Sequence, residues 1–213
     1  MRRRAFFLLI GLLVLFMLGA LTPDAEAVQV KRVQRGIANF DTDDVAALAS
    51  LTYSVDQTKS IILLNVSGDS VSNNDQNWFY TADFADNTSI SIDRAGGNSP
   101  SSVVWQVIEF ADGVTIQRGI TVVNGTNNSA GKQKSITLAA LSTTTASGTA
   151  CGTAQGYPYN NFPCRALPII QVRASYTNAT RTDEVVFLPS FTNNTTLFLE
   201  RSDSGSGKVS SIV

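Results

Sequence analysis

The sequence predicts an all-β protein in which two tandem antiparallel β-sandwich domains follow a signal peptide. Three observations lead to this prediction: an internal repeat, short stretches in which apolar and polar residues alternate, and a composition rich in Ser, Thr, Asn, Val and Ile after the leader. Alternation with a period of two and abundant turn residues are typical of strands and hairpins. The expected units are a signal peptide at residues 1–27, a first repeat at 28–112 and a second repeat at 113–213.

The segment 1–27 has the pattern of a secretory leader. Arginines at positions 2–4 precede an apolar run over residues 5–21, and the small-x-small triplet Ala25-Glu26-Ala27 ends the segment. Cleavage before Val28 places the mature chain in a secreted, extracellular or cell-surface location, with the periplasm also open. The alternative is an uncleaved anchor, because the apolar run is close to the length of a spanning helix. In the cleaved form we expect no membrane span.

Two phrases occur twice, and the distance between their copies differs. VQRGIANF at Val33 recurs as IQRGITVV at Ile116, and FADNTSISIDR at Phe84 recurs as FTNNTTLFLER at Phe191. The numbering offset between copies is 83 for the first phrase and 107 for the second. The second repeat therefore carries an insertion, which falls around 143–165. Self-similarity of this kind predicts a duplicated folding unit.

The match extends to other strands of the repeat. KSIILLNVSGDS near Ser60 aligns with ALPIIQVRASYT near Leu167, and the chain end SSIV aligns with SSVV at Ser101. In the first repeat this last strand continues into Trp105–Phe110. An incomplete final strand is therefore expected in the second repeat, and we expect the sequence to belong to a longer protein whose next residues complete it. The alternative is that a neighbouring subunit donates the strand.

The alternation also predicts which side chains face the core. One parity is apolar in both copies of the central hairpin, whereas the other includes Thr81, Asp83 and Ser190. The expected core residues are Trp78, Tyr80, Ala82, Phe84, Ile90 and Ile92 in the first repeat and Val185, Phe187, Pro189, Phe191, Leu197 and Leu199 in the second. Both parities are apolar around Trp105, so its position in the core or at an interface is left open.

The junction between the repeats reads Asp112-Gly113, a turn dipeptide between strand-like residues, so a hairpin-like turn rather than a linker is expected. Arginines occupy matching positions in both copies, as Arg35 with Arg118 and as Arg94 with Arg201. Such arginines could hold a ligand in each copy, but a role in covering sheet edges or pairing with carboxylates is favoured. The neighbouring Gly36 and Gly119 would permit a bulge or tight bend.

The order of these pieces resembles the H-type lectin repeat: a strand with a V-x-R-G-like turn, an apolar strand, a polar loop, a hairpin and a closing V-x-W strand. The similarity is one of pattern over most of each copy, without a diagnostic motif. The resemblance implies a small antiparallel β-sandwich, sugar binding and an oligomer, commonly a trimer. No sugar-binding residue is assigned from it.

The composition argues against an enzyme and against nucleic-acid binding. The chain has no histidine, which excludes Ser-His and Cys-His nucleophile pairs and imidazole metal ligands, and its net charge is −1. Acidic residues gather in two loops, at Asp41, Asp43 and Asp44 and at Asp69 and Asp75. Paired carboxylates for glycoside hydrolysis and a calcium site are the alternatives, but solvated turn residues are the favoured interpretation. No catalytic residue, metal or cofactor is predicted.

The insertion in the second repeat is the candidate recognition element. Cys151 and Cys164 are the only cysteines, and a disulfide between them is the default for an exported chain, with two free thiols as the alternative. The enclosed loop carries aromatic rings beside amides, a composition typical of recognition loops. The candidate binding residues are Tyr157, Tyr159, Asn160, Asn161 and Phe162. The same rings could instead cap their own sandwich.

Two classes of function follow. The first is a secreted or cell-surface binding or adhesion module that is not an enzyme, with glycans or other surface proteins as partners. The second is a structural subunit of an extracellular or surface assembly, in which strand edges and apolar sandwich ends contact other copies. Homo-oligomers are compatible with both classes.

Overall fold

The structure is a computed structural model that describes residues 28–67, 79–96, 99–124, 133–142, 166–175, 187–201 and 209–212. Within these residues the regular structure is strand, apart from one short 3-10 helix, η1 (Gln57–Lys59). Every strand pair is antiparallel. The predicted all-β, antiparallel fold is therefore confirmed.

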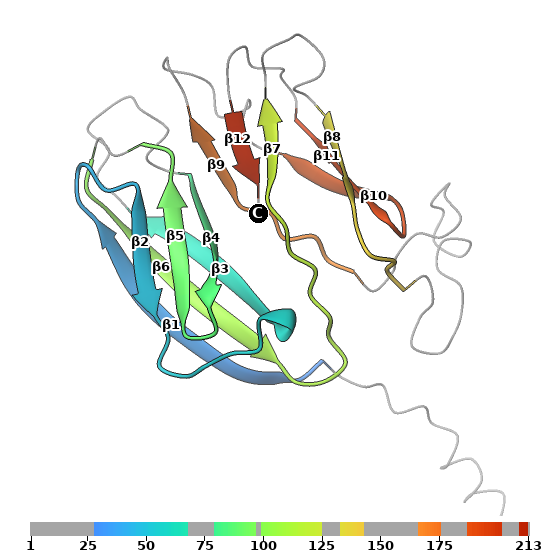
Figure 1. Cartoon of the computed structure of the whole chain (residues 1–213), viewed down its shortest axis with the longest axis horizontal. Helices are drawn as coiled ribbons and strands as arrows, with labels where there is room; N and C mark the ends of the chain where they lie inside the picture. The colour runs from blue at the N-terminus through green and yellow to red at the C-terminus, as the bar shows by residue number, and fades with distance from the viewer. Residues whose placement is uncertain are drawn as a thin grey trace, which may run out of the picture.

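The first repeat forms two three-stranded sheets that pack face to face. Their orders are β1-β6-β3 and β2-β5-β4 (Figure 1). The strands are β1 (Val30–Phe40), β2 (Ala46–Ser50), β3 (Ser60–Ser67), β4 (Tyr80–Asp86), β5 (Ser89–Arg94) and β6 (Ser101–Phe110).

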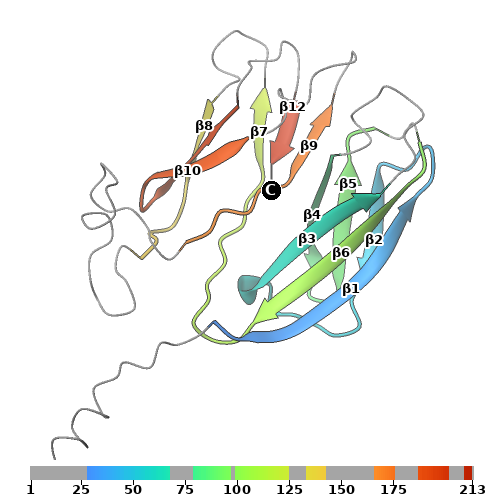
Figure 2. The same ribbon diagram turned by 180° about the vertical axis from the view of Figure 1, so that it is seen from behind.

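The second repeat forms two further sheets in the same strand order, β7-β12-β9 and β8-β11-β10. The strands are β7 (Thr121–Asn124), β8 (Gln133–Thr137), β9 (Val172–Ser175), β10 (Leu188–Asn193), β11 (Thr196–Glu200) and β12 (Val209–Ile212). Figures 1 and 2 show the two sheet pairs side by side, with β3 and β4 of the first facing β9 of the second.

Strand registers agree between the two repeats. Phe84 pairs with Ile90 as Phe191 pairs with Leu197, and both ladders have an irregularity just after the phenylalanine. The phrase that first revealed the repeat therefore marks the same hairpin twice.

One part of the sequence alignment is wrong by a single residue. Val66 pairs with Val103, and Val172 pairs with Ile212, the residue aligned with Val103. Val66 thus corresponds to Val172, at a spacing of 106 rather than 107. Both aligned segments are runs of apolar residues, so the sequence alone did not determine their register. The hydrogen-bonded strand pairs do.

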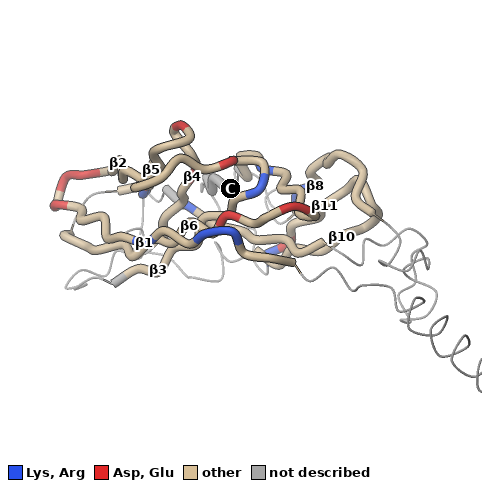
Figure 3. Tube along the Cα trace, turned by 90° about the horizontal axis from the view of Figure 1, so that it is seen from below, with Lys and Arg blue, Asp and Glu red and all other residues tan. Residues whose placement is uncertain are grey.

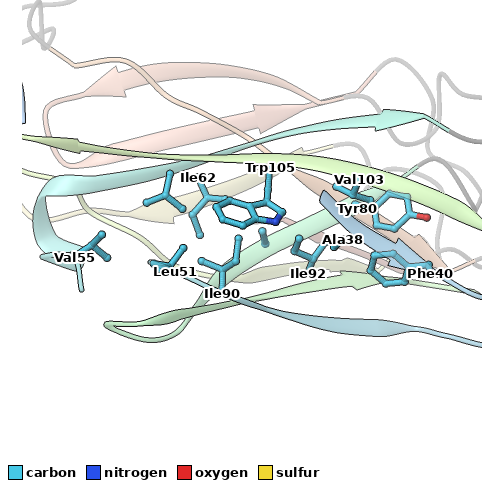
Figure 4. Packing of buried hydrophobic residues seen from close by; sticks show 12 residues of the cluster. Ala38, Phe40, Leu51, Val55, Ile62, Tyr80, Ile90, Ile92, Val103 and Trp105 are labelled. Carbon is cyan, nitrogen blue, oxygen red and sulfur yellow. The ribbon is translucent and has the colours of Figure 1, made fainter. Parts of the chain in front are cut away.

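The larger core lies between the first two sheets (Figure 4). Five side chains in it are at most 1% exposed: Phe40, Ile90, Ile92, Val103 and Val107. Trp105, left open by the alternation, is 5% exposed and belongs to this core. Its ring lies against Gly36, where an added Cβ would be 2.3 Å from Cζ2 of the indole. Gly36 is therefore required for a close approach rather than for a bend.

The second core is smaller. Among the described residues it consists of Val123, Phe187 and Leu199, with partly buried apolar residues around them. The predicted hairpin-like turn is present at Asp112 and Gly113, and Gly113 has a φ of 88°. The strand expected directly after this turn is absent, however, because residues 114–120 have no strand pairing and β7 begins only at Thr121.

Most of the predicted core residues are buried. Tyr80, Ala82, Phe187 and Phe191 have relative exposures of 8% or less, and Ile90, Ile92 and Leu199 have 0%. Phe84 and Pro189 are half-buried, and Trp78 and Val185 lie outside the described residues. Thr81 was expected on the outer face but is 4% exposed, because β4 lies where the first sheet pair meets the second repeat.

Candidate functional site at the junction of the repeats

The loop predicted to recognise a partner cannot be compared with the structure. Tyr157, Tyr159, Asn160, Asn161 and Phe162 lie outside the described residues, as do Cys151 and Cys164. The disulfide and the role of the loop stay predictions. The described chain resumes directly after this loop at Ala166, and residues 169–172 then line the junction between the repeats.

The first acidic loop is a turn, as favoured from the sequence. The Asp44 carboxylate accepts a hydrogen bond from the Asp41 N–H at 2.8 Å, and the Asp44 N–H donates to the Asp41 carbonyl at 3.2 Å. This acidic segment joins β1 to β2 at one end of the molecule (Figure 3). Asp69 and Asp75, in the other acidic loop, lie outside the described residues.

Arg94 has a structural role. It is 1% exposed and donates to the carbonyls of Asp41, Asp44 and Ser99, the last at 2.7 Å. Its guanidinium also lies 5.1 Å from the ring centroid of Phe40. The matching Arg201 is 2% exposed and lies 5.4 Å from the Phe187 ring. The favoured scaffold interpretation is therefore confirmed for Arg94, and Arg201 is buried in the same way.

The other matched arginines occupy different environments. Arg35 lies exposed on β1, whereas Arg118 docks on the first repeat. The Arg118 guanidinium donates to the carbonyls of Ser60 and Gln57 and lies 4.5 Å from the Phe84 ring centroid. Burial lowers the pKa of Arg118, and the Asp83 carboxylate 3.9 Å away opposes that shift. Arginine stays charged in proteins, so this is a cationic contact that orients one repeat on the other.

Gln171 makes a second polar contact between the repeats. Its side-chain oxygen accepts from the Ala82 N–H at 2.6 Å, and its Nε2 donates to the Ile62 carbonyl at 2.8 Å. Ala82 is in β4 and Ile62 in β3, and each of these is an edge strand of one first-repeat sheet. Edge strands present backbone groups that need partners, and a carboxamide supplies one donor and one acceptor. Gln171 therefore bridges the open side of the first sheet pair.

An apolar cavity of about 380 Å³ lies beside this bridge. Residues at equivalent positions of the two repeats line this cavity from both sides, so matching parts of the two sheet pairs lie opposite each other. The equivalent pairs are Leu63 with Ile169, Leu64 with Ile170, Val66 with Val172 and Tyr80 with Phe187. The lining favours an apolar ligand or apolar protein side chains, because few polar groups point to this space.

A second, polar cavity of about 570 Å³ lies at the η1 end of the first repeat. Lys31 donates to Oε1 of Glu109 at 2.7 Å, while Oε2 of Glu109 is buried without a hydrogen-bond partner among the described residues. Burial raises the pKa of Glu109, but the bonds from Lys31 and the Asp56 N–H outweigh it, and the net pKa lies below the usual value. The Glu109 carboxylate is therefore ionised near neutral pH.

The repeated glutamine has a structural role that was not predicted from the sequence. The Gln34 amide donates to the Tyr53 carbonyl and accepts from the Tyr53 N–H, both at 2.9 Å. The Gln117 amide makes the same two bonds to Ala139, at 3.0 and 2.7 Å. The glutamine stands beside the arginine in both VQRG and IQRG, so its repetition was the available signal.

No family model matches this chain, and no curated protein or solved structure matches it either. Among the described residues, no helix has the length and apolar character needed to cross a membrane, and no group of His, Cys, Asp and Glu could hold a metal ion.

Proposed function

We propose that this chain is a non-enzymatic module of a secreted or cell-surface protein, in which two tandem β-sandwich domains are held in one orientation for a structural or adhesive role. The junction carries this proposal. Arg118 bonds the first repeat through two carbonyls and one carboxylate, and Gln171 bonds one edge strand of each of its two sheets. A further ion pair joins Arg173 to Asp93 at 3.8 Å.

Directional bonds of this kind differ from a flexible linker, which leaves neighbouring domains free to reorient. Repeats that each contact their neighbours in a fixed way present one extended surface. Such a surface suits an element of an assembly or an adhesin, and the leader at residues 1–27 is consistent with export. Contact with other surface proteins or with further copies of the chain would use this surface.

One observation favours ligand binding as a second candidate function. The cavity between the repeats has a volume within the range of small-molecule sites, and such sites often lie at domain interfaces. Its apolar lining suits an apolar ligand better than a sugar. A glycan would instead be held by the loop residues Tyr157, Tyr159 and Phe162.

The structural proposal is tested on the purified chain 28–213. Sedimentation velocity and electron microscopy over a concentration series should show self-association, and a glycan array measures sugar binding on the same sample. Assembly that is weakened by Arg118→Ala and not by Arg35→Ala supports the proposal. Arg35 is the matched control because it occupies the equivalent position and is exposed.

A chain that stays monomeric at all concentrations and binds a defined glycan would contradict the structural role. Small-angle X-ray scattering of Arg118→Ala adds a direct test of the junction. We expect a larger radius of gyration in this variant, since the two sheet pairs lose their cationic contact. An unchanged scattering curve would show that Arg118 does not set their orientation.

A further inference from the structure

The two sheets of the first repeat differ on the sides that face away from their shared core. In β2, β4 and β5 the outward positions are mostly polar, as at Asp83, Ser91 and Asp93. This alternation is typical of an antiparallel sheet with one solvated side. In β1, β3 and β6 the outward positions are mostly apolar as well. Strands that are apolar on both faces are typical of sheets that are covered on both sides.

We call the outward apolar residues of the β1-β6-β3 sheet the outer face. They are Val33, Ile37, Ile61, Val104, Ile108 and Phe110. Strand pairing groups them, since Ile108 lies between Val33 and Ile61, and Val104 pairs with Ile37. Ile37 is 65% exposed, Val33 40% and Val104 37%, so the outer face is open to solvent in the single chain. In Figure 2 the second repeat lies beside this sheet rather than over its outer side.

The outer face has the size that a weak specific interface needs. The sheet has three strands, and its central strand β6 has 10 residues. With the usual rise per residue and spacing between strands, the face measures about 34 Å by about 14 Å, or about 500 Å². The largest apolar patch of a typical monomer covers about 300–600 Å² and is often functional. Two such faces together bury about 1,000 Å², which is the lower limit for a specific interface.

Shape and charge favour a second copy of the chain as the partner. Branched aliphatic side chains on a sheet pack well against another sheet, at a separation of about 10 Å. Arg35 is the one charged residue at the outward positions between the pairs Val33–Ile108 and Asn39–Ser102. It lies on the edge strand β1. A two-fold axis along β6 therefore places β1 of each copy over β3 of the other, and the two arginines lie at opposite rims of the contact.

We propose that the outer face is a homodimer interface, in which two copies of the chain pack sheet against sheet about a two-fold axis along β6. Such a contact uses the same surface on both copies, so it closes at two. Burial of apolar side chains supplies the affinity, and Val104 and Ile108 lie at the centre, where contacts contribute most. Arg35 stays at the hydrated rim, where a charge contributes little to affinity, so Arg35→Ala leaves the dimer unchanged.

This interface rests on the proposed structural role and names the surface through which copies meet, but the two can fail separately. Self-association that Arg118→Ala weakens and Val104→Lys does not would contradict the outer-face dimer alone. A dimer that Val104→Lys disrupts and Arg118→Ala does not would contradict only the role given to the junction.

The test is sedimentation equilibrium of the chain 28–213. We expect a reversible equilibrium between monomer and dimer that does not weaken as the salt concentration rises, because apolar burial is not screened. Ile37→Lys and Val104→Lys should each raise the dissociation constant by about tenfold or more, since each places a charge in the apolar contact. Val104→Thr keeps a β-branched side chain in the strand and should weaken the dimer in the same direction, which covers a folding defect in the lysine variants.

The matched control is Leu48→Lys, at an outward position of β2 on the other sheet. Leu48 is 69% exposed, close to the 65% of Ile37, so the two substitutions change equally solvated side chains. Leu48→Lys should leave the dimer unchanged, and the melting temperatures of both variants in dilute solution should agree. A chain that stays monomeric up to about 1 mM overturns the proposal, even where another protein binds the outer face. A dimer that the outer-face substitutions leave unchanged, or that Leu48→Lys weakens equally, overturns it as well.

Discussion

Substituting the two equivalent glycines separately tests the packing described for Trp105. In Gly36→Ala the new Cβ would lie 2.3 Å from Cζ2, 2.6 Å from Cε2 and 3.0 Å from Nε1 of Trp105. Favourable carbon contacts lie at about 3.5–4.0 Å, so the ring must retreat by about 1 Å or more. The ring is 5% exposed and packed within the first core, so its movement displaces other core side chains.

Overpacking of this kind typically costs about 1–3 kcal/mol of unfolding free energy. For a unit the size of one repeat, each kcal/mol lowers the melting temperature by about 4–8 °C. We therefore expect Gly36→Ala to melt at least about 4 °C below the unmodified chain. Differential scanning calorimetry on residues 28–213 measures this directly.

Gly119→Ala is the matched control. Among the described residues its Cβ meets no atom within 4 Å, and its φ is not in the left-handed region, so the native state tolerates the methyl group. The expected change is within about 1 kcal/mol, and in the stabilising direction, because alanine restricts the unfolded chain. Equal melting of Gly36→Ala and the unmodified chain, or an equal loss in both variants, would refute the packing argument.

Three further predictions concern buried polar groups. Gln34→Leu should destabilise the chain by about 1–3 kcal/mol in urea unfolding, since two backbone groups of Tyr53 lose their partner. Retention of full stability would contradict this role of Gln34. Arg94→Lys should lower the free energy of unfolding by about 2 kcal/mol or more, because lysine cannot reproduce the planar guanidinium that bonds several carbonyls. Arg35→Lys, at an exposed position, should change it by no more than about 0.5 kcal/mol. Equal effects of the two substitutions would argue against the scaffold role of Arg94. The pKa of Glu109 is lowered on folding, so its contribution to stability is present above its ordinary pKa and is lost as pH falls through the folded value. Lys31→Met should therefore destabilise the chain at pH 7 and reduce the stability that is lost on acidification. An unchanged dependence of stability on pH would contradict the stabilising bond between Lys31 and Glu109.

The comparison of Lys31→Met with the unmodified chain is needed because other carboxylates titrate in the same range. The pKa values of Asp56, Asp86 and Asp112 are also lowered, the first two by bonds from neighbouring threonines and the third by Lys59. Lys31 also lowers the pKa of Asp56 and Asp112, but only as a distant charge, whereas it bonds Glu109 directly, so the difference between the two profiles reports mainly on Glu109.

The sequence by itself determined the strand content, the repeat and most inward-facing positions. These properties are local: alternation assigns Tyr80, Ala82, Ile90 and Ile92 to one face, and two copies of the phrase at Phe84 and Phe191 report one hairpin. A side chain's face follows from its parity along a strand, whatever the strand pairs with. The scaffold role of Arg94 was the favoured prediction from the sequence, although its repetition was also compatible with a ligand in each copy.

Only the tertiary structure decided which matched residues share a role. Arg35 and Arg118 are equivalent in sequence, but Arg118 bonds the other sheet pair, to the carbonyls of Ser60 and Gln57. Gln171 matches no glutamine in the first repeat, and its partners Ile62 and Ala82 lie in strands far earlier in the chain. Such contacts depend on how distant strands meet, which local pattern does not encode. Gly36 and Gly119 also match in sequence, but only the structure shows that the Trp105 ring lies against the first of them.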